Sequence, residues 1–455
     1  MTDPTDPTFT ARLKRAVVGD ASARFVYLNN FEVERVWGRD EPGLPGAGLT
    51  FTGVTVNRME ECGVLLADDR DAVVLKAPVD DAYLAYLRSL DLAAGRRMIV
   101  DRNEPAQSVT ANALDSPRLL AALAALADGG TYLMPLGVSP DEERLSAVTG
   151  LPLAAPGAAV CKRVNGKIFS RELVDAAGLT PVPGTECRTV AELAEALRTR
   201  FVPGDGVRVV VKESLGVSGR GMVVLDRAQQ AERLLRSMGR YHPDGRASLV
   251  VERWIDKACD LNYQFIVGRD GAVHFETVKT ALVDGGVHRG HLFPPTLRPE
   301  QTGELEKAAA EIGRALAAEG YFGLVGVDAM LGVDGTLYPC LEINARFNMA
   351  TYQNRVAERL LDREQCALAT VFDLRPRRTY GFEQVVAALG DLALDAGDRR
   401  GVLINNFATL NAAVVDGEES YGRLYGICIG ETAAEVRDLR DAAEAALTKM
   451  VVAGP

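Results

Sequence analysis

Two apolar segments in the last third of the chain, 325–331 and 341–347, flank a short polar connection. This connection contains Asp334-Gly335, a residue pair that is a strong signal for a tight turn between two strands. We therefore expect the two segments to form a β-hairpin.

The polar side chains inside this hairpin carry the clearest chemical signal in the sequence. Asp328 lies within the first segment, and Glu342, Asn344 and Arg346 alternate in the second, so these last three share one strand face. A carboxylate in an apolar strand is costly unless it is paired or binds a cation. Two carboxylates, an amide oxygen and a guanidinium suit magnesium that holds a polyphosphate, which is the predicted function. The alternative is a hairpin whose polar face lies in solvent.

Length and composition limit the architecture and the partners. A chain of 455 residues exceeds what one core usually organises, so two or three domains are expected. The formal net charge of −11 argues against a nucleic-acid partner, because duplex-binding proteins have basic surfaces. No apolar run reaches the roughly 18 residues of a membrane span, and the seven cysteines form no CxxC pair. We therefore expect a soluble cytoplasmic protein with reduced cysteines and no membrane partner.

The N-terminal third has the alternating pattern of an α/β domain. Helical periodicity at 81–92 and 116–127 separates short apolar runs, which favours a layered fold with a largely parallel sheet. No GxGxxG motif follows the first strand, so dinucleotide binding is not supported. The predicted domain covers 1–157, with 1–15 disordered. Its predicted strands are 25–28, 63–66, 72–75, 98–100 and 131–134.

A second unit, predicted for 158–375, contains a glycine-rich turn between two strands. The first strand, 207–212, ends at Lys212, and the return strand covers 223–225. Glycines in such a turn leave backbone N–H groups open to an anion, and the lysine adds positive charge. The turn lacks the GK[ST] ending and the following helix of a Walker A loop. We predict a flap over a phosphate group; an ordinary hairpin loop is the alternative.

Another glycine-rich stretch, 284–295, holds His288, Arg289 and His291, and therefore two of the four histidines in the chain. We predict a loop that serves as a substrate lid, because polar loops on a sheet scaffold frequently carry function. A solvated loop without function is the alternative.

The last segment, 376–455, is predicted to be a small α+β cap packed beside the catalytic unit. Its predicted strands are 401–404 and 422–429, and its predicted helix is 433–450.

The order of these motifs resembles the ATP-grasp superfamily over roughly 165–355, and the upstream region resembles the pre-ATP-grasp domain. One departure is Gly166, at a position where Asp is common in the family. The resemblance implies an α/β protein with an N-terminal pre-ATP-grasp domain, an ATP-grasp catalytic part of α+β type and a small C-terminal α+β segment.

The resemblance also implies ATP and Mg²⁺ as cofactors, with Mn²⁺ as a substitute, and it assigns roles to residues. In the family, two lysines and a flap contact the phosphates, a hinge presents its backbone to adenine, and a carboxylate holds the ribose. The residues that match these nucleotide-binding positions are Lys167, Lys212, Gly216, Ser218, Gly219, Gly221, Glu252, Arg253, Trp254, Ile255 and Asp260. The matching metal ligands are Asp328, Glu342 and Asn344. The expected catalytic arginines are Arg289 and Arg346, and the expected substrate contacts are His288 and His291.

The chemistry that the resemblance implies is amide-bond formation. A carboxylate attacks the γ-phosphate of ATP, and an amine then displaces phosphate from the acyl phosphate. The layout is similar to that of the stand-alone peptide ligases of antibiotic biosynthesis, such as the pheganomycin-type ligases, which join an amino acid to a peptide amine. Similar enzymes are frequently homodimers, although no sequence feature decides the oligomeric state here. The alternatives are a carboxylase that activates bicarbonate and a non-catalytic nucleotide-binding regulator.

Overall fold

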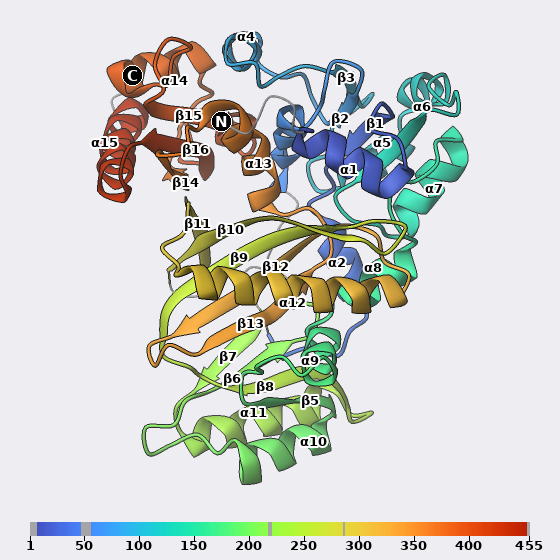
Figure 1. Ribbon diagram of the computed structural model, residues 1–455, viewed down its shortest axis with the longest axis vertical. Coiled ribbons are helices and arrows are strands. Elements are labelled where there is room, and N and C mark those ends of the chain that lie inside the picture. The colour runs from blue at the N-terminus through green and yellow to red at the C-terminus, as the bar shows by residue number, and fades with distance from the viewer. Residues whose placement is uncertain (1–6, 47–55, 217–220, 285–286, 453–455) are drawn as a thin grey trace.

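The computed structural model describes residues 7–46, 56–216, 221–284 and 287–452. Within these residues the strands form three sheets, one of them parallel and two of them antiparallel. Figure 1 shows the strands of the large antiparallel sheet that lie between residues 257 and 344 in the middle of the molecule. The N-terminal domain and the C-terminal segment, whose strands continue this sheet, lie above them, and a smaller sheet lies below. Across this part of the chain, no helix combines the length and the hydropathy that a membrane span requires.

The N-terminal domain is built around a parallel sheet of order β3-β2-β1-β4, as the alternating sequence pattern predicts. Apolar side chains of β1 and β2 are fully buried between the helices on the two faces of the sheet. The elements are α1 (Phe9–Val18), β1 (Arg24–Leu28), α2 (Val33–Gly38), the 3-10 helix η1 (Met59–Leu65), β2 (Ala72–Leu75), α4 (Asp81–Ser89), β3 (Arg96–Ile99), α5 (Val109–Leu114), α6 (Pro117–Ala124), β4 (Thr131–Pro135), α7 (Pro140–Thr149) and α8 (Ala158–Val164).

One predicted strand of this domain, 63–66, is wrong, because these residues belong to η1 and the residue after it. Every side chain of η1 is buried, including those of Glu60 and Glu61. A short run that is buried on all sides has no periodicity by which a helix can be distinguished from a strand. Glu61 accepts hydrogen bonds from the backbone N–H groups of Phe407 (3.0 Å) and Ala408 (2.8 Å), which ties η1 to the C-terminal segment.

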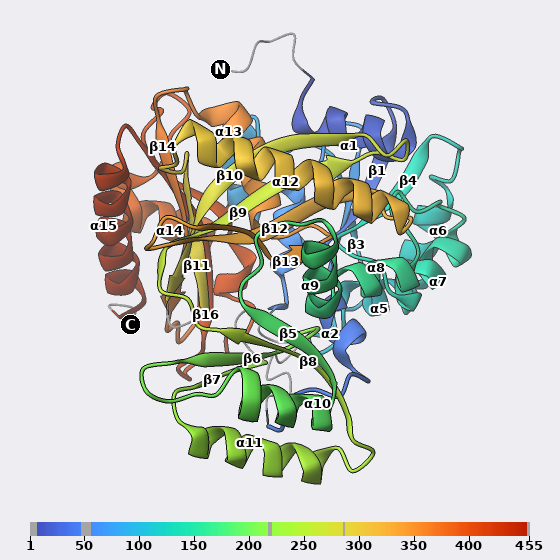
Figure 2. The ribbon, with the colours of Figure 1, turned by 60° about the horizontal axis from the view of Figure 1, so that its bottom comes forward.

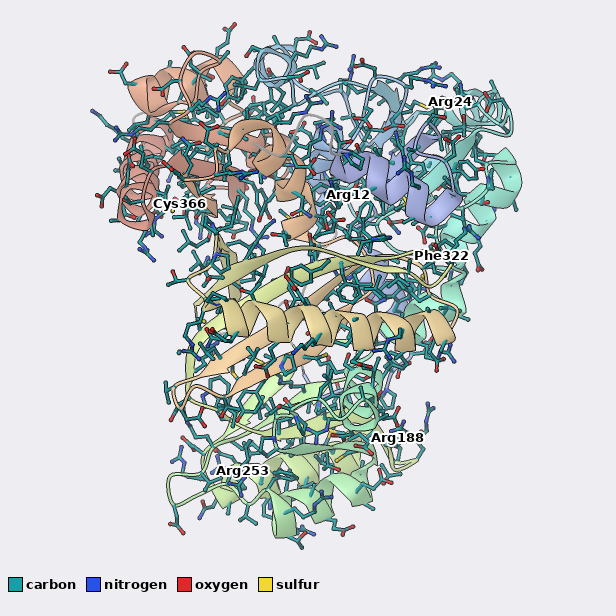
Figure 3. All side chains as sticks on the ribbon, in the orientation of Figure 1. Arg12, Arg24, Arg188, Arg253, Phe322 and Cys366 are labelled. Carbon is teal, nitrogen blue, oxygen red and sulfur yellow. The ribbon has the colours of Figure 1, made fainter. Side chains whose placement is uncertain are left out.

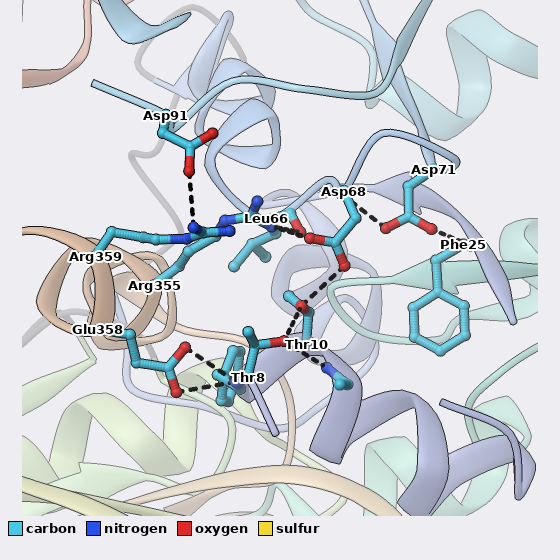
Figure 4. Close-up of polar contacts among 12 residues, drawn as sticks. Thr8, Thr10, Phe25, Leu66, Asp68, Asp71, Asp91, Arg355, Glu358 and Arg359 are labelled. Carbon is cyan, nitrogen blue, oxygen red and sulfur yellow. Dashed lines mark hydrogen bonds and ion pairs between the residues drawn. The ribbon is translucent and has the colours of Figure 1, made fainter. Parts of the chain in front are cut away.

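The predicted disorder of residues 1–15 is wrong from Phe9 onward, where α1 begins; residues 1–6 lie outside the described part of the chain. Thr8 caps the helix, and Glu358 accepts two hydrogen bonds from the backbone N–H of Phe9, at 2.9 and 3.0 Å. Figure 4 shows this contact beside the bond from Thr10 to Asp68. Phe9 is fully buried, so α1 is stabilised by tertiary packing. The Pro- and Asp-rich sequence before the helix gives no indication of this packing.

The large sheet has the order β13-β12-β9-β10-β11-β14-β16-β15. Helix α12 lies across one face of β9, β10 and β12 (Figures 1 and 2), where its apolar side chains share a core with these strands. The predicted hairpin is present as β12 and β13, and Gly335 in its turn has a φ of 83°. The elements are β9 (Lys257–Val267), β10 (Val273–Asp284), β11 (Val287–Phe293), α12 (Pro299–Ala318), β12 (Gly323–Gly332), β13 (Leu337–Asn344) and α13 (Met349–Leu360).

The predicted loop at 284–295 is wrong, because most of this stretch is strand β11, which pairs with β10 on one side and β14 on the other. Gly290 lies in this strand with a φ of 151°, and a Cβ there would lie 1.8 Å from the carbonyl oxygen of Ala369. The glycine is therefore required for the close approach of two strands. In the sequence, a glycine with this function cannot be distinguished from a glycine in a loop.

The C-terminal segment contains the predicted strands and helix, and its strands continue the large sheet. β16 pairs with β14 and β15 in antiparallel register, so this segment shares the sheet of the central unit, whereas the sequence predicted a cap packed beside it. The elements are β14 (Cys366–Leu374), α14 (Phe382–Leu389), the 3-10 helices η3 (Gly390–Leu392) and η4 (Ala408–Leu410), β15 (Gly401–Asn406), β16 (Gly422–Gly430) and α15 (Ala433–Val452).

The smaller antiparallel sheet has the order β5-β8-β6-β7 and lies on the β13 side of the large sheet (Figure 2). Thr189 and Glu192 form a capping box at the start of α10. The glycine-rich turn joins the antiparallel strands β6 and β7; Ser218 and Gly219 in it lie outside the described residues. The elements are α9 (Lys167–Ala176), β5 (Gly184–Thr189), α10 (Val190–Glu195), the π-helix η2 (Ala196–Arg200), β6 (Val209–Glu213), β7 (Met222–Leu225), α11 (Ala228–Tyr241) and β8 (Arg246–Arg253).

Candidate active site

Two carboxylates of the β12/β13 hairpin lie opposite each other, since Asp328 pairs with Glu342 in the strand register. Amide groups hold Asp328 from both sides. Asn262 of β9 donates to Asp328 Oδ1 at 2.8 Å, and Asn344 donates to Asp328 Oδ2 at 3.1 Å. The three predicted metal ligands, Asp328, Glu342 and Asn344, are therefore neighbours. Asn262 lies beside these three residues, but it was not among the residues predicted for the site. The sequence feature that could have identified it is an amide side chain within an apolar strand.

Burial, followed by repulsion from Glu342, raises the pKa of Asp328 to about 6, and the two amide hydrogen bonds only partly offset this. The site thus holds concentrated negative charge in an environment that disfavours it. Such charge is stabilised when a cation binds.

Lys167 connects the hairpin to the flap. Its Nζ donates to Glu342 Oε1 and to the carbonyl oxygen of Gly216, in each case at 2.7 Å. Lys167 is the first residue of α9, and its backbone N–H bonds to the carbonyl of Ser214 at 2.9 Å, so the helix start is fixed against the end of β6. The lysine therefore stands between the carboxylates and the turn predicted to cover phosphate.

The second predicted lysine, Lys212 of β6, donates to Glu252 Oε2 of β8 at 2.6 Å. Burial lowers the pKa of Lys212, but the charges of Glu252, Glu342 and Asp260 outweigh this effect, so its pKa is raised and the side chain remains a cation. Positive charge is thus held between the small sheet and the hairpin.

A cavity of about 230 Å³ lies between the small and the large antiparallel sheets, and both lysines and both carboxylates of the hairpin line it. We call it the nucleotide cavity. Lys167, Lys212, Gly216, Gly221 and Asp260 all line it, which brings together predicted nucleotide-binding residues from three elements and the turn. Gly221 has a φ of 74°, and a Cβ there would collide with the Glu213 carboxylate. Apolar side chains that the sequence did not single out complete the cavity wall, namely Met222, Leu261, Ala281, Val283, Ala329 and Leu341.

The predicted adenine hinge, 252–255, does not line this cavity in the described structure. The backbone N–H groups of Arg253 and Trp254 bond to the carbonyl oxygens of Pro183 (2.8 Å) and Arg208 (2.9 Å). The Arg253 side chain is exposed and lies within the small-sheet unit (Figure 3). Ile255 packs against the same small apolar cluster as Leu341, a residue of the cavity wall.

A second cavity, of about 280 Å³, adjoins the first; we call it the substrate cavity. Arg346 and Arg289, the two predicted catalytic arginines, both line it. Arg346 pairs with Glu34 of α2 and donates to Asn344 Oδ1 at 2.8 Å, and Arg289 of β11 donates to Asp373 Oδ2 at 2.8 Å. Asp328, Glu342 and His288 line both cavities, so these three residues mark where the two cavities meet.

The two predicted substrate histidines lie together on β11, with their Nε2 atoms 3.2 Å apart. Burial lowers the pKa of His288 to about 4 and lowers the pKa of His291 further, so both rings are neutral at physiological pH. His291 also bonds to Gln353, which in turn accepts a hydrogen bond from the buried Lys279. Only His288 reaches both cavities, whereas His291 lines the substrate cavity alone.

The residues at the junction of the cavities fit a hard divalent cation. Oδ1 of the buried Asn262 has no hydrogen-bond partner among the described residues, and it lies beside Asp328. Two carboxylates with amide oxygens suit Mg²⁺, which keeps several waters and phosphate oxygens and does not need a cage of protein ligands. The described residues contain no group of three or more His, Cys, Asp or Glu side chains that could hold a metal ion.

Two family models match the chain in the same order as the domains. The pre ATP-grasp domain matches residues 59–151, and the ATP-binding domain of the carbamoyl-phosphate synthase L chain matches residues 166–358. The second match spans the flap, the lysines and the hairpin.

Curated relatives and solved structures agree with these matches. The [butirosin acyl-carrier protein]–L-glutamate ligase of Niallia circulans is 28% identical over 203 residues, and pyruvate carboxylase 1 of Caenorhabditis elegans is 26% identical over 210 residues. Each alignment covers 44% of this chain, and the chain spans 48% of the first relative and 17% of the second.

Among solved structures, the biotin carboxylase of Campylobacter jejuni superposes with a TM-score of 0.56 at 14% identity, over 94% of this chain and 95% of that chain. The biotin carboxylase domain of the Hydrogenobacter thermophilus 2-oxoglutarate carboxylase, in complex with MgADP and bicarbonate, gives 0.53 at 16% identity, over 92% and 89%. At these identities the likeness concerns the fold. Together with the domain matches, it confirms the predicted ATP-grasp fold with an N-terminal α/β domain.

Proposed function

The chain is an ATP-grasp superfamily enzyme with a pre-ATP-grasp domain, and on this premise we propose that it is an ADP-forming ligase that joins a carboxylate to an amine through an acyl phosphate. The observation that carries this proposal is the junction of two cavities at Asp328, Glu342 and His288. One cavity has the cations and glycines that a triphosphate requires, and the other has arginines suited to a carboxylate. A carboxylate in the second cavity would therefore meet the γ-phosphate in the first.

The chemical obstacle in this reaction is that one anion attacks another, so catalysis depends on charge neutralisation and positioning. Lys167 and Lys212 would hold the phosphates, and Arg346 would hold the carboxylate at the junction. Asp328, Glu342 and Asn344, together with Asn262, would hold Mg²⁺. When bound, the ion would neutralise phosphate charge between the two reactants.

No side-chain nucleophile is needed for this chemistry, because the substrate carboxylate itself attacks phosphorus. The oxygen that the carboxylate gives up leaves with inorganic phosphate when the amine forms the amide. The amine must lose a proton in this second step. The departing phosphate can carry that proton away, and His288, which lines both cavities, would contact the amine.

We further propose that the activated carboxylate belongs to an amino acid and that the acceptor is an amine or a peptide, as in peptide ligases of antibiotic biosynthesis. The similarity to a relative named as an L-glutamate ligase of butirosin formation supports an amino acid as substrate and secondary metabolism as the setting. A homodimer is compatible with the proposal, since one structural neighbour is described as a dimer.

The proposal is tested by measuring ADP release with ATP, Mg²⁺ and a mixture of amino acids and dipeptides, followed by mass spectrometry of the products. We expect ADP and phosphate release that depends on the mixture, with a product heavier by one amino-acid residue. Formation of AMP, or binding of ATP without stimulated release, would contradict it; the second result would favour a nucleotide-binding regulator.

A second candidate is the activation of bicarbonate, which the fold likeness to biotin carboxylases favours. It is distinguished in the same assay, because bicarbonate alone would then stimulate ADP release and the amino acids would add nothing.

A further inference from the structure

The substrate cavity contains a separate apolar wall whose side chains come from distant parts of the chain. Val56, Met59 and Tyr425 are buried together, with Phe31, Met349 and Val371 packed against them, and all six line the cavity. They belong to the N-terminal domain, to the start of α13 and to strands β14 and β16. None of these six residues lines the nucleotide cavity.

The polar atom within this wall is already used. The hydroxyl of Tyr425 lies 3.9 Å from the sulfur of Met59, and it also forms a hydrogen bond with the side chain of Arg423. Tyr425 thus contributes its ring to the cavity, and its neighbours contribute an aromatic ring, aliphatic groups and thioether groups. Such a surface gains free energy by contact with an apolar group and offers no partner to a charged one.

The charged residues beside the wall are paired with one another. Asp373 accepts from Arg289 at 2.8 Å and from the Tyr421 hydroxyl at 2.5 Å, and Arg423 lies 3.7 Å from the same carboxylate. A second carboxylate on the substrate, such as that of glutamate, would have to compete with Asp373 for these arginines. An apolar substituent would instead displace water from the wall without breaking an ion pair.

We propose that the substrate cavity selects a small carboxylic acid with an apolar body, such as an aliphatic, thioether-containing or aromatic amino acid, as the molecule that is activated. This inference rests on the proposed ligase function and specifies its substrate class. The acid group lies at the junction with Asp328 and Glu342, and the apolar body contacts the wall around Met59 and Tyr425. The cavity, at about 280 Å³, lies just below the range of roughly 300–1,000 Å³ typical of drug-sized ligands, which suits one amino acid.

The activated acid is identified by trapping with hydroxylamine. Hydroxylamine attacks the acyl phosphate carbon, phosphate leaves, and the acid is recovered as its hydroxamate, so the readout reports the activated partner and not the acceptor. The panel contains leucine, methionine, phenylalanine, alanine, glutamate, aspartate and lysine, each with ATP and Mg²⁺. We expect the best apolar acid to exceed glutamate by at least about 50-fold in kcat/KM, since contacts with an apolar pocket discriminate roughly 10–200-fold for each methylene.

Two variants and one control locate the selectivity in the wall. Val371→Lys places a cation there and should lower kcat/KM for the apolar acids at least about tenfold while narrowing the gap to glutamate. Met349→Gln changes polarity at nearly constant size and should shift the same ratio in the same direction. Val148→Lys is the matched control, because Val148 is 55% exposed on α7. Thermal melts establish that each variant is folded.

Binding gives a readout that does not depend on turnover. Calorimetry of the preferred acid, with a non-hydrolysable ATP analogue present, should give a negative heat-capacity change that becomes smaller in Val371→Lys. Preference for glutamate, aspartate or lysine in the trapping assay would overturn this inference and leave the ligase function standing. Absence of both hydroxamate and ADP with every acid would overturn the proposed function itself, and this inference with it.

Discussion

The two cavities that meet at Asp328 and Glu342 differ in how the chain builds them. Every described residue that lines the nucleotide cavity lies between Lys167 and Glu342. These residues belong to α9, to strands of the small and large sheets, and to the turn between β6 and β7. The substrate cavity draws on residues from Phe31 to Tyr425, so the N-terminal domain, the hairpin and the C-terminal strands all contribute to it. Under the proposed function, phosphate chemistry is therefore confined to one region of the chain, whereas substrate recognition depends on how three regions pack together.

The largest effect is expected at the junction, which both cavities share. Glu342→Gln removes a charge from the metal-binding group while the side-chain volume is nearly kept, so ADP release should fall by about 10³-fold or more in a protein that remains folded. Glu306→Gln, on the exposed face of α12, is the matched control. Turnover at the wild-type rate in Glu342→Gln would remove the hairpin from the mechanism.

The next effect concerns the contact that joins η1, which supplies Met59, to the C-terminal segment. Burial raises the pKa of Glu61 from 4.5 to about 7. Below pH 4.5 the folded and unfolded chains both keep this proton, but between 4.5 and 7 only the unfolded chain loses it, so stability falls as the pH rises. This loss is on the order of 3 kcal/mol for a shift of this size.

Glu61→Gln keeps an oxygen that accepts from the Phe407 and Ala408 N–H groups and removes the titration. Urea unfolding of the wild type and the variant at about pH 4.5 and about pH 8 should therefore give stabilities that diverge as the pH rises, in favour of the variant. Parallel pH profiles would mean that Glu61 does not titrate in this range.

A variant at Arg289 tests the substrate cavity alone, because Arg289 lines the substrate cavity and not the nucleotide cavity. Arg289→Ala should lower kcat/KM for the carboxylate by about 10²-fold and change the Kd for ATP by less than about twofold, because it removes a cation that offsets the Asp373 carboxylate beside the substrate cavity, where an unpaired charge costs roughly 1–3 kcal/mol or more. Both constants are measured on one preparation. A loss confined to ATP affinity would assign Arg289 to the nucleotide.

Lys212 supplies the opposite test, because it lines only the nucleotide cavity. Lys212→Ala should raise the Kd for ATP about 30-fold, through loss of one charge-assisted contact, with a smaller effect on the KM of the carboxylate. Nucleotide binding is followed by calorimetry. An equal loss for both ligands would mean that the cavities act as one site.

The smallest effect is expected at Arg253, a predicted nucleotide-binding residue whose side chain is exposed on the small-sheet unit. Arg253→Ala should leave the Kd for ATP unchanged within about twofold, as is usual for exposed side chains. A tenfold weaker Kd would indicate that the 252–255 segment moves toward the nucleotide on binding.

The same contrast explains what could be predicted from the sequence. The hairpin, the strand-end lysine and the turn between β6 and β7 have local signals, namely Asp334-Gly335, Lys212 and closely spaced glycines, and both predicted strand pairs are observed. The ATP-grasp fold follows from that order. The wall of the substrate cavity has no local signal, since Val56 and Val371 resemble any other core residues until the domains pack.

The errors have the same physical origin. Helix α1 is held by Glu358 and by the burial of Phe9, and both contacts are long-range. Gly290 resembles a loop residue in the sequence, but it is a glycine because β14 passes close to its backbone. Asn262 was missed because a single amide in an apolar strand gains meaning only beside Asp328.

The proposed function depends on one step, in which a carboxylate in the substrate cavity attacks the γ-phosphate in the nucleotide cavity. It is tested most directly by supplying the preferred acid, or the amino-acid mixture, with ¹⁸O in the carboxylate and analysing the released phosphate by mass spectrometry. We expect one ¹⁸O atom to be transferred to phosphate for each amide formed, together with release of ADP. Amide formation with unlabelled phosphate, or with AMP in place of ADP, would contradict it.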